Sequence, residues 1–135
     1  MSTQTVTIDQ KESFFTATNV ALWVIQLGAA FLFISAGANK LGGNEQMVGL
    51  FNAIGVGQWF RFVTGGLEVF GAILLVIPAF IGLGGLILTG VMFGAVATHL
   101  FIIGGNPTFA IVLLLASIVI AYARRDRTIE LIRKF

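Results

Sequence analysis

A glutamate stands near the middle of an apolar stretch that is long enough to form a membrane-crossing helix. In RFVTGGLEVFGAILLVIP, residues 61–78, Glu68 is the one acid, and Arg61 lies two helical turns before it. A carboxylate in hydrocarbon costs several kcal/mol unless it is neutralised or paired. Acids in such positions are therefore candidates for proton relay or ligand binding.

Other polar side chains share helical stripes with small residues, and the stripes indicate which faces meet. At 3.6 residues per turn, three stripes can converge in a bundle. They are Arg61, Thr64, Gly65, Glu68, Gly71 and Ala72 in one segment, Gln26, Ala30, Phe33, Gly37 and Lys40 in an earlier one, and Met92, Ala95 and His99 in a later one. The apolar residues Phe62, Val69, Phe70, Leu74 and Ile77 mostly face elsewhere.

Depth and side-chain direction also favour a cluster of Lys40, Glu68 and His99. Glu68 lies about 12 Å and His99 about 8 Å below the outer ends of their helices, at 1.5 Å per residue. Helical side chains lean toward their own amino terminus, so these three point toward one level. Arg61 leans away from Glu68, and we expect it to be a cation at the outer rim.

We assign catalytic roles to Glu68 and His99 on this basis and expect four ligand contacts. The expected contacts are Lys40, Arg61, Thr64 and Trp59. No metal site is predicted, because one histidine without cysteine is a poor ligand set and excludes bis-histidine haem ligation within the chain. The competing interpretation is that the cluster only holds three helices together.

Composition places the whole chain in a membrane. The 135 residues are 57% hydrophobic and 10% charged, with a mean hydropathy of +0.97. We expect an all-α fold, a single transmembrane domain over 1–135 that forms a four-helix bundle. The crossings are predicted at about 20–39, 59–78, 80–103 and 107–123, with polar tails at 1–19 and 124–135.

Basic residues predict the orientation, because lysine and arginine near membrane segments stay on the cytoplasmic side. Five of the eight follow the last crossing: Arg124, Arg125, Arg127, Arg133 and Lys134. We expect a multi-pass protein of the bacterial inner membrane with both termini, and Lys11, in the cytoplasm. The basic tail indicates contact with the anionic lipid bilayer, and no nucleic-acid partner is expected. Asp9 and Glu12 outweigh Lys11, which argues against a signal peptide.

The link between the first two crossings has its own helical pattern. Asn44 can cap a short amphipathic helix whose apolar positions follow the i, i+3, i+4, i+7 rule, and Gly55 and Gly57 can end it. The apolar positions are Met47, Leu50, Phe51 and Ile54. We expect this helix at the outer interface, with Trp59 and Phe60 anchoring the next crossing; it is either a lid or a shield.

Proline and glycine predict tight turns and a close helix approach. Pro78 closes the second crossing, and Asn106 with Pro107 caps and starts the fourth. Gly90 and Gly94 form a small-xxx-small pattern. This pattern predicts packing within the bundle or, alternatively, a homo-oligomer contact.

FLFISAGANKL, MVGLFNAIGVGQWFRFVTGGLEVFGAILLVIP and GAVATHLFIIGG resemble the DoxX-like family of small four-helix membrane proteins, over about residues 20–125. By position Lys40, Glu68 and His99 match recurring polar residues of the family pattern. The family takes its name from a subunit of a thiosulfate:quinone oxidoreductase, although no thiosulfate-binding signature is visible.

Three functional hypotheses follow. In the first, the chain is a quinone-linked redox or respiratory accessory subunit, where His99 donates a hydrogen bond to a quinone carbonyl and Glu68 relays protons. It has no intrinsic cofactor, and a redox partner subunit supplies the electrons. The second is a non-enzymatic membrane scaffold or assembly subunit. The third, transport of a small solute, is weakest because no repeat or broken helix is visible. With no cysteine, the chain runs no thiol–disulfide exchange of its own.

Overall fold

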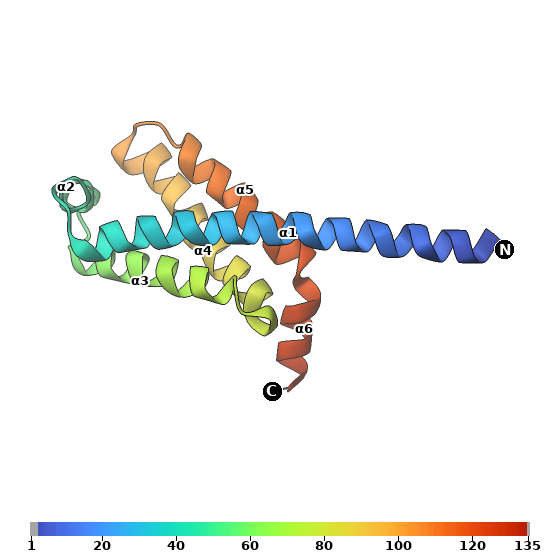
Figure 1. The fold of residues 1–135 in the computed structure, drawn as a ribbon. Helices are drawn as coiled ribbons and strands as arrows, with labels where there is room; N and C mark the ends of the chain where they lie inside the picture. Colours follow the sequence, from blue (N-terminus) through green and yellow to red (C-terminus); the bar gives the residue numbers. More distant parts are fainter. Residues whose placement is uncertain (1–2, 135) are drawn as a thin grey trace.

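The computed structural model describes the backbone of residues 3–134 and the side chains of residues 16–134, and within this part of the chain it contains helices and no strand. The elements, in order, are α1 (Thr3–Gly42), α2 (Glu45–Ile54), α3 (Trp59–Leu74), the 3₁₀ turn η1 (Pro78–Phe80), α4 (Ile81–Thr98), the π-helical turn η2 (His99–Ile103), α5 (Thr108–Ala123) and α6 (Arg125–Lys134) (Figure 1). The all-α prediction is confirmed.

Two helical stretches are long and apolar enough to cross a membrane by themselves. They are Thr16–Gly42 and Pro78–Ile103. A third is obtained if α5 and α6, which meet at 58°, count as one broken span. Helix α3 has only 16 residues, about 24 Å at 1.5 Å per residue. The described chain therefore has two to three candidate spans, so four crossings are supported only in part.

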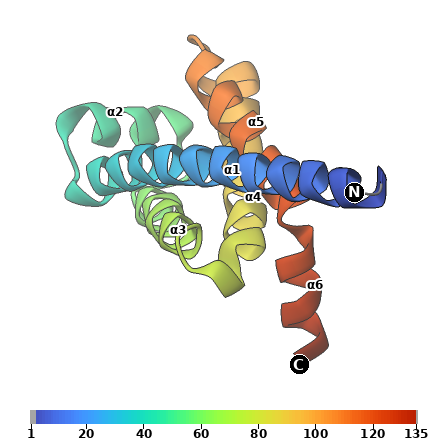
Figure 2. The same ribbon diagram turned by 45° about the vertical axis from the view of Figure 1, so that its right-hand side comes forward.

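The long helices form two pairs that diverge toward one end. Helix α1 packs along α3 and α4 packs along α5, while α3 also contacts α4. Figures 1 and 2 show α4 and α5 leaning away from α1 and α3 toward the end that carries α2. We call this the α2 end, and the opposite one the α6 end. A wedge therefore opens between the pairs at the α2 end.

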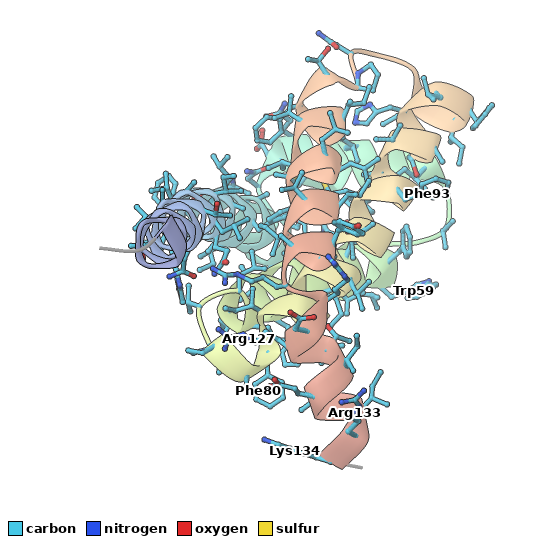
Figure 3. All side chains as sticks on the ribbon, turned by 90° about the vertical axis from the view of Figure 1, so that its right-hand side faces the viewer. Trp59, Phe80, Phe93, Arg127, Arg133 and Lys134 are labelled. Atoms are coloured by element: carbon cyan, nitrogen blue, oxygen red, sulfur yellow. The ribbon has the colours of Figure 1, made fainter. Side chains whose placement is uncertain are left out.

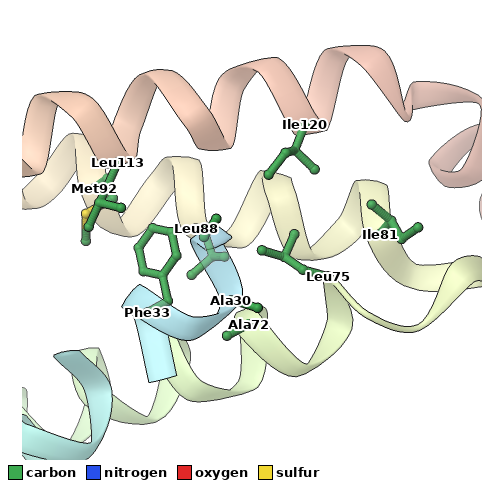
Figure 4. Close-up of a cluster of buried hydrophobic side chains, with 10 residues drawn as sticks. Ala30, Phe33, Ala72, Leu75, Ile81, Leu88, Met92, Leu113 and Ile120 are labelled. Atoms are coloured by element: carbon green, nitrogen blue, oxygen red, sulfur yellow. The ribbon is translucent and has the colours of Figure 1, made fainter. Parts of the chain in front are cut away.

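The core fills the space where the pairs cross. It includes Phe33 from α1, Leu75 after α3, Leu88 from α4 and Ile120 from α5, all fully buried (Figure 4). Leu74, which was expected to face away, is also buried with 6% of its surface exposed, because α4 covers this end of α3 at Gly84.

A polar latch closes the α6 end. The Gln26 side chain donates to the Leu75 carbonyl at 3.1 Å and accepts from Nε of Arg124 at 2.9 Å. Both side chains are buried. The latch joins α1, the end of α3 and the end of α5, so the helices cannot separate there without leaving a buried guanidinium unpaired.

Local sequence signals set several helix ends as predicted. The Asn44 side chain accepts a hydrogen bond from the Met47 amide at 2.9 Å, and Gly55 ends α2 with φ 84°. The chain breaks before Pro78, and Asn106 accepts from the Thr108 amide at 3.0 Å at the start of α5. Pro107, expected in the first turn of that helix, is instead at its N-cap position, because α5 begins at Thr108.

Both tails are more helical than expected. Helix α1 begins at Thr3, and α6 continues the chain after α5, running across the direction of α1 (Figure 1). Ile129 and Ile132 are exposed on α6 beside the exposed Arg125 and Arg133. The side chains of Asp9, Lys11 and Glu12 lie outside the described residues.

Candidate functional site

A buried ion pair joins α1 to α3. Nζ of Lys40 lies 2.6 Å from Oε1 of Glu68, and 1% of the Glu68 side chain and 18% of the Lys40 side chain are exposed. Each residue comes from the stripe that the sequence predicted. The pairing provides the counter-charge that an acid needs in apolar surroundings.

Arg61 is bonded to the backbone of Lys40 and is buried, whereas the sequence predicted a cation at the outer rim. Its guanidinium donates to the Lys40 carbonyl through Nη1 and to Oε1 of Gln58 at 2.8 Å through Nε, and it lies 4.4 Å from the centre of the Phe62 ring. Only 7% of Arg61 is exposed. Its long side chain folds back across the loop after α1, so it satisfies a carbonyl at the carboxyl end of that helix.

A cavity of about 890 Å³ opens in the wedge beside the ion pair. Lys40, Thr64 and Glu68 line one side of it, and Met92 and His99 line the other. Trp59 and Arg61 are not among the residues that line the cavity. Trp59 projects at the periphery (Figure 3), where its indole donates to the Val56 carbonyl at 3.1 Å. Four of the six predicted site residues therefore lie on one cavity.

His99 shares the cavity but not the ion pair. Its Nδ1 lies 3.1 Å from the Gly104 carbonyl oxygen, and among the described residues no hydrogen bond or ion pair joins it to Lys40 or Glu68. A carbonyl only accepts, so in this contact Nδ1 is the donor.

One oxygen of the buried carboxylate has no partner. Oε2 of Glu68 makes no hydrogen bond with any described residue, although less than 1 Å² of its surface is exposed. Such orphan acceptors are rare in folded proteins because burial without a partner costs about 1–3 kcal/mol. Among the described residues, Oε2 of Glu68 is the one buried side-chain oxygen or nitrogen of the cavity-lining residues without a hydrogen-bond partner.

Helix α2 forms a wall of the cavity with its apolar face. The lining residues from α2 are Met47, Leu50, Phe51 and Ile54, the positions predicted from the helical pattern. Phe51 is also packed edge-on against Phe60, with ring centres 6.0 Å apart. The amphipathic prediction is confirmed, and the helix covers the wedge between the two helix pairs.

Gly90 and Gly94 do not pack against a neighbouring helix within the chain. A Cβ atom built at either position meets no described atom within 4 Å, and both residues line the cavity. The expected packing role is wrong. It belongs instead to Gly84 and Gly85, where an added Cβ would lie 2.8 Å from the backbone of Gly71 and Ala121, respectively.

Helix α5 contributes a wall that the sequence did not predict. Phe109, Ala110 and Leu113 line the cavity. The helix is apolar on all sides, so no periodic signal marks its inner face. Among the described residues, no group of three or more His, Cys, Asp or Glu side chains lies close enough to hold a metal ion.

Residues 24–122 match the profile of the DoxX-like family. The chain belongs to the DoxX-like family. No curated protein and no solved structure matches it. The resemblance seen in the sequence is thereby confirmed. The matched region runs from the middle of α1 to the end of α5, and it includes α3 and the cavity-lining residues.

Proposed function

We propose that this DoxX-like membrane protein binds the head group of a membrane quinone in the cavity and acts as the membrane subunit of a quinone-linked redox system. The observation that carries the proposal is the buried Lys40–Glu68 pair, with a free carboxylate oxygen, on the wall of a cavity of about 890 Å³. Ligand sites typically have volumes of 300–1,000 Å³ and few polar groups within an apolar lining.

The arrangement of polar and apolar groups suits an amphiphile. Lys40 and Glu68 stand on one wall with His99 opposite, and apart from five serine, threonine and asparagine residues the rest of the lining is apolar. A polar head group would satisfy the first set and an isoprenoid tail the second. Glu68 would exchange protons with the head group, and a partner subunit would supply the electrons.

The proposal includes a topology. We place four crossings, formed by α1, α3, α4 and α5, in a bacterial inner membrane as one domain over 1–135. The basic residues of α6 favour a cytoplasmic carboxyl terminus, and an even number of crossings returns the amino terminus to the same side. Reporters fused at the two ends should both lie in the cytoplasm, whereas one inserted near Asn44 should lie outside.

A scaffold or assembly subunit is the second candidate, and the contacts of Arg61 favour it. Arg61 and Glu68 both fix Lys40, one through its carbonyl and the other through its ammonium group. Two side chains of α3 that hold the same residue of α1 are also what a structural cross-link requires. Under this alternative the cavity holds bulk lipid only, and Gly90 and Gly94 remain free for a homo-oligomer contact.

The quinone content of the purified protein separates the two candidates. Wild-type protein extracted in mild detergent should retain quinone above the level of the bulk lipid extract, and Glu68→Gln should lower the retained amount at least about tenfold, or 1.4 kcal/mol. Ser117→Ala removes a buried hydroxyl that bonds to the Leu113 carbonyl outside the cavity, and serves as the matched control. Equal retention by wild type and Glu68→Gln would refute the quinone role.

A further inference from the structure

Helix α2 spans the open end of the wedge. It contacts α3 on one side and η2 on the other, so it bridges the two helix pairs. Met47, Leu50 and Ile54 line the cavity and are half-buried, and within α2 Phe51 is the one buried residue. The apolar face of α2 is therefore turned to the cavity over most of its length.

Glycines with a left-handed backbone flank α2 at both ends. Gly43 precedes the helix with φ 68°, and Gly55 and Gly57 follow it with φ 84° and 119°. Glycine reaches both signs of φ at little cost, and loop residues of this kind absorb the dihedral changes of hinge motions. The helix can therefore turn as a rigid unit about its two ends.

The side chain of Gln58, the residue before α3, ties α2 to the rest of the chain. Its Nε2 donates to the Val48 carbonyl at 3.0 Å and to Oδ1 of Asn52 at 2.8 Å, both in α2, and its Oε1 accepts from Nε of Arg61 at 2.8 Å. Arginine only donates and a carbonyl only accepts, so these partners decide which end of the amide faces which. Among the described residues, no other side-chain hydrogen bond connects α2 to a segment beyond its own caps.

The same amide is connected to the ion pair through Arg61. The Arg61 guanidinium donates to the Lys40 carbonyl, and the Lys40 ammonium group pairs with Glu68. A continuous series of contacts thus runs from α2 to the buried carboxylate on the cavity wall.

We propose that α2 is a lid that opens and closes the cavity, and that Gln58 is the positioning residue that holds the lid closed; this inference rests on the proposed function. When the bonds from Gln58 to Val48 and Asn52 break, α2 turns on its glycines away from η2, and a head group gains access to the ion pair. When they form, α2 covers the bound ligand. The helix is then a lid and not a fixed shield.

Gln58→Glu isolates the bonds that close the lid. An ionised carboxylate has nearly the same size and still accepts from Arg61, but it sets an oxygen without a proton against the Val48 carbonyl. Gln58→Met removes the hydrogen bonds on both sides. Gln46→Glu makes the same chemical change at an exposed residue of α2 and is the matched control.

The first measurement needs no ligand, because the chain has no cysteine of its own. Ala36→Cys places a single thiol on the cavity wall, and a water-soluble methanethiosulfonate reagent labels it in nanodiscs at a rate set by access from water. In this background Gln58→Glu and Gln58→Met should each raise the labelling rate at least about tenfold, since the open fraction grows. Gln46→Glu should leave the rate unchanged. Equal rates with and without the Gln58 changes would overturn the inference.

The second measurement is the kinetics of decylubiquinone binding to the full-length protein in nanodiscs. A lid limits entry as well as exit, so Gln58→Glu should raise both rate constants at least about fivefold and change their ratio less. A rise in the dissociation rate alone would mean a fixed wall, and would overturn the lid while the quinone site stands. A folded wild type that binds no decylubiquinone, although Gln58→Glu still speeds labelling, would refute the proposed function and leave the lid supported.

Discussion

The two ends of α4 contain pairs of glycines with opposite surroundings. At the α6 end, a Cβ added to Gly84 or Gly85 would lie 2.8 Å from a neighbouring backbone, so these residues allow α3 and α5 to approach. At the α2 end, Gly90 and Gly94 have no described atom within 4 Å of that position. The same residue type therefore closes one end of the molecule and leaves the other open.

The polar contacts also differ between the two ends of the molecule. The Gln26–Arg124 latch ties three segments at the α6 end. At the α2 end Lys40 and Glu68 join only α1 to α3, and His99 is bonded to its own loop. One end is thus cross-linked across both helix pairs and the other within a single pair. A helix bundle can therefore be closed at one end while it forms a cavity at the other.

Breaking the ion pair should have the largest effect on stability. Lys40→Met leaves the Glu68 carboxylate buried without a counter-charge, which typically costs about 3–5 kcal/mol. We expect the melting temperature in detergent to fall by roughly 10 °C. The double variant Lys40→Met, Glu68→Leu removes both charges and should recover most of the loss; a single variant as stable as wild type would show that the pair is not buried in solution.

Crowding the closed end should come next. Gly84→Ala places a methyl group 2.8 Å from the Gly71 carbonyl oxygen and 2.9 Å from Cβ of Leu74. Backbone cannot yield as a flexible side chain does, and overpacking costs about 1–3 kcal/mol. Thermal unfolding monitored by circular dichroism measures this loss. A melting temperature equal to that of wild type would mean that α3 and α4 are farther apart than the structure shows.

The same change at the open end should have the smallest effect and the opposite sign. Gly94→Ala meets open space within a helix, where alanine is favoured over glycine by roughly 0.5–1 kcal/mol. The melting temperature should rise by a few degrees or stay the same. A clear fall would indicate that another helix, in this chain or a second copy, packs on Gly94, and would support the homo-oligomer contact.

The sequence predicted what helical periodicity and local capping determine. The stripe from Gln26 to Lys40 and the stripe from Arg61 to Ala72 are inner faces, because the polar and small residues recur every three or four positions. The Asn44 cap and the Gly55 stop depend on adjacent residues only. The two stripes supplied three of the residues on the cavity wall, Lys40, Thr64 and Glu68.

The other features of the site depend on how the helices are arranged relative to one another, which helical periodicity does not determine. The divergence of the two helix pairs decides that Gly84 is packed and Gly94 is free, although both stand in the same helix. The reach of Arg61 to the Lys40 carbonyl follows from the path of the loop between α1 and α3. The contact between Nδ1 of His99 and the Gly104 carbonyl follows from the turn that presents this carbonyl.

Filling the cavity tests most directly the claim that the open end is a ligand site. Gly94→Leu adds a side chain at the wall where no described atom lies within 4 Å, so the fold should tolerate it. We expect a melting temperature close to that of wild type together with at least about a tenfold loss of retained quinone, or 1.4 kcal/mol. Wild-type quinone content in a Gly94→Leu protein of unchanged stability would contradict it.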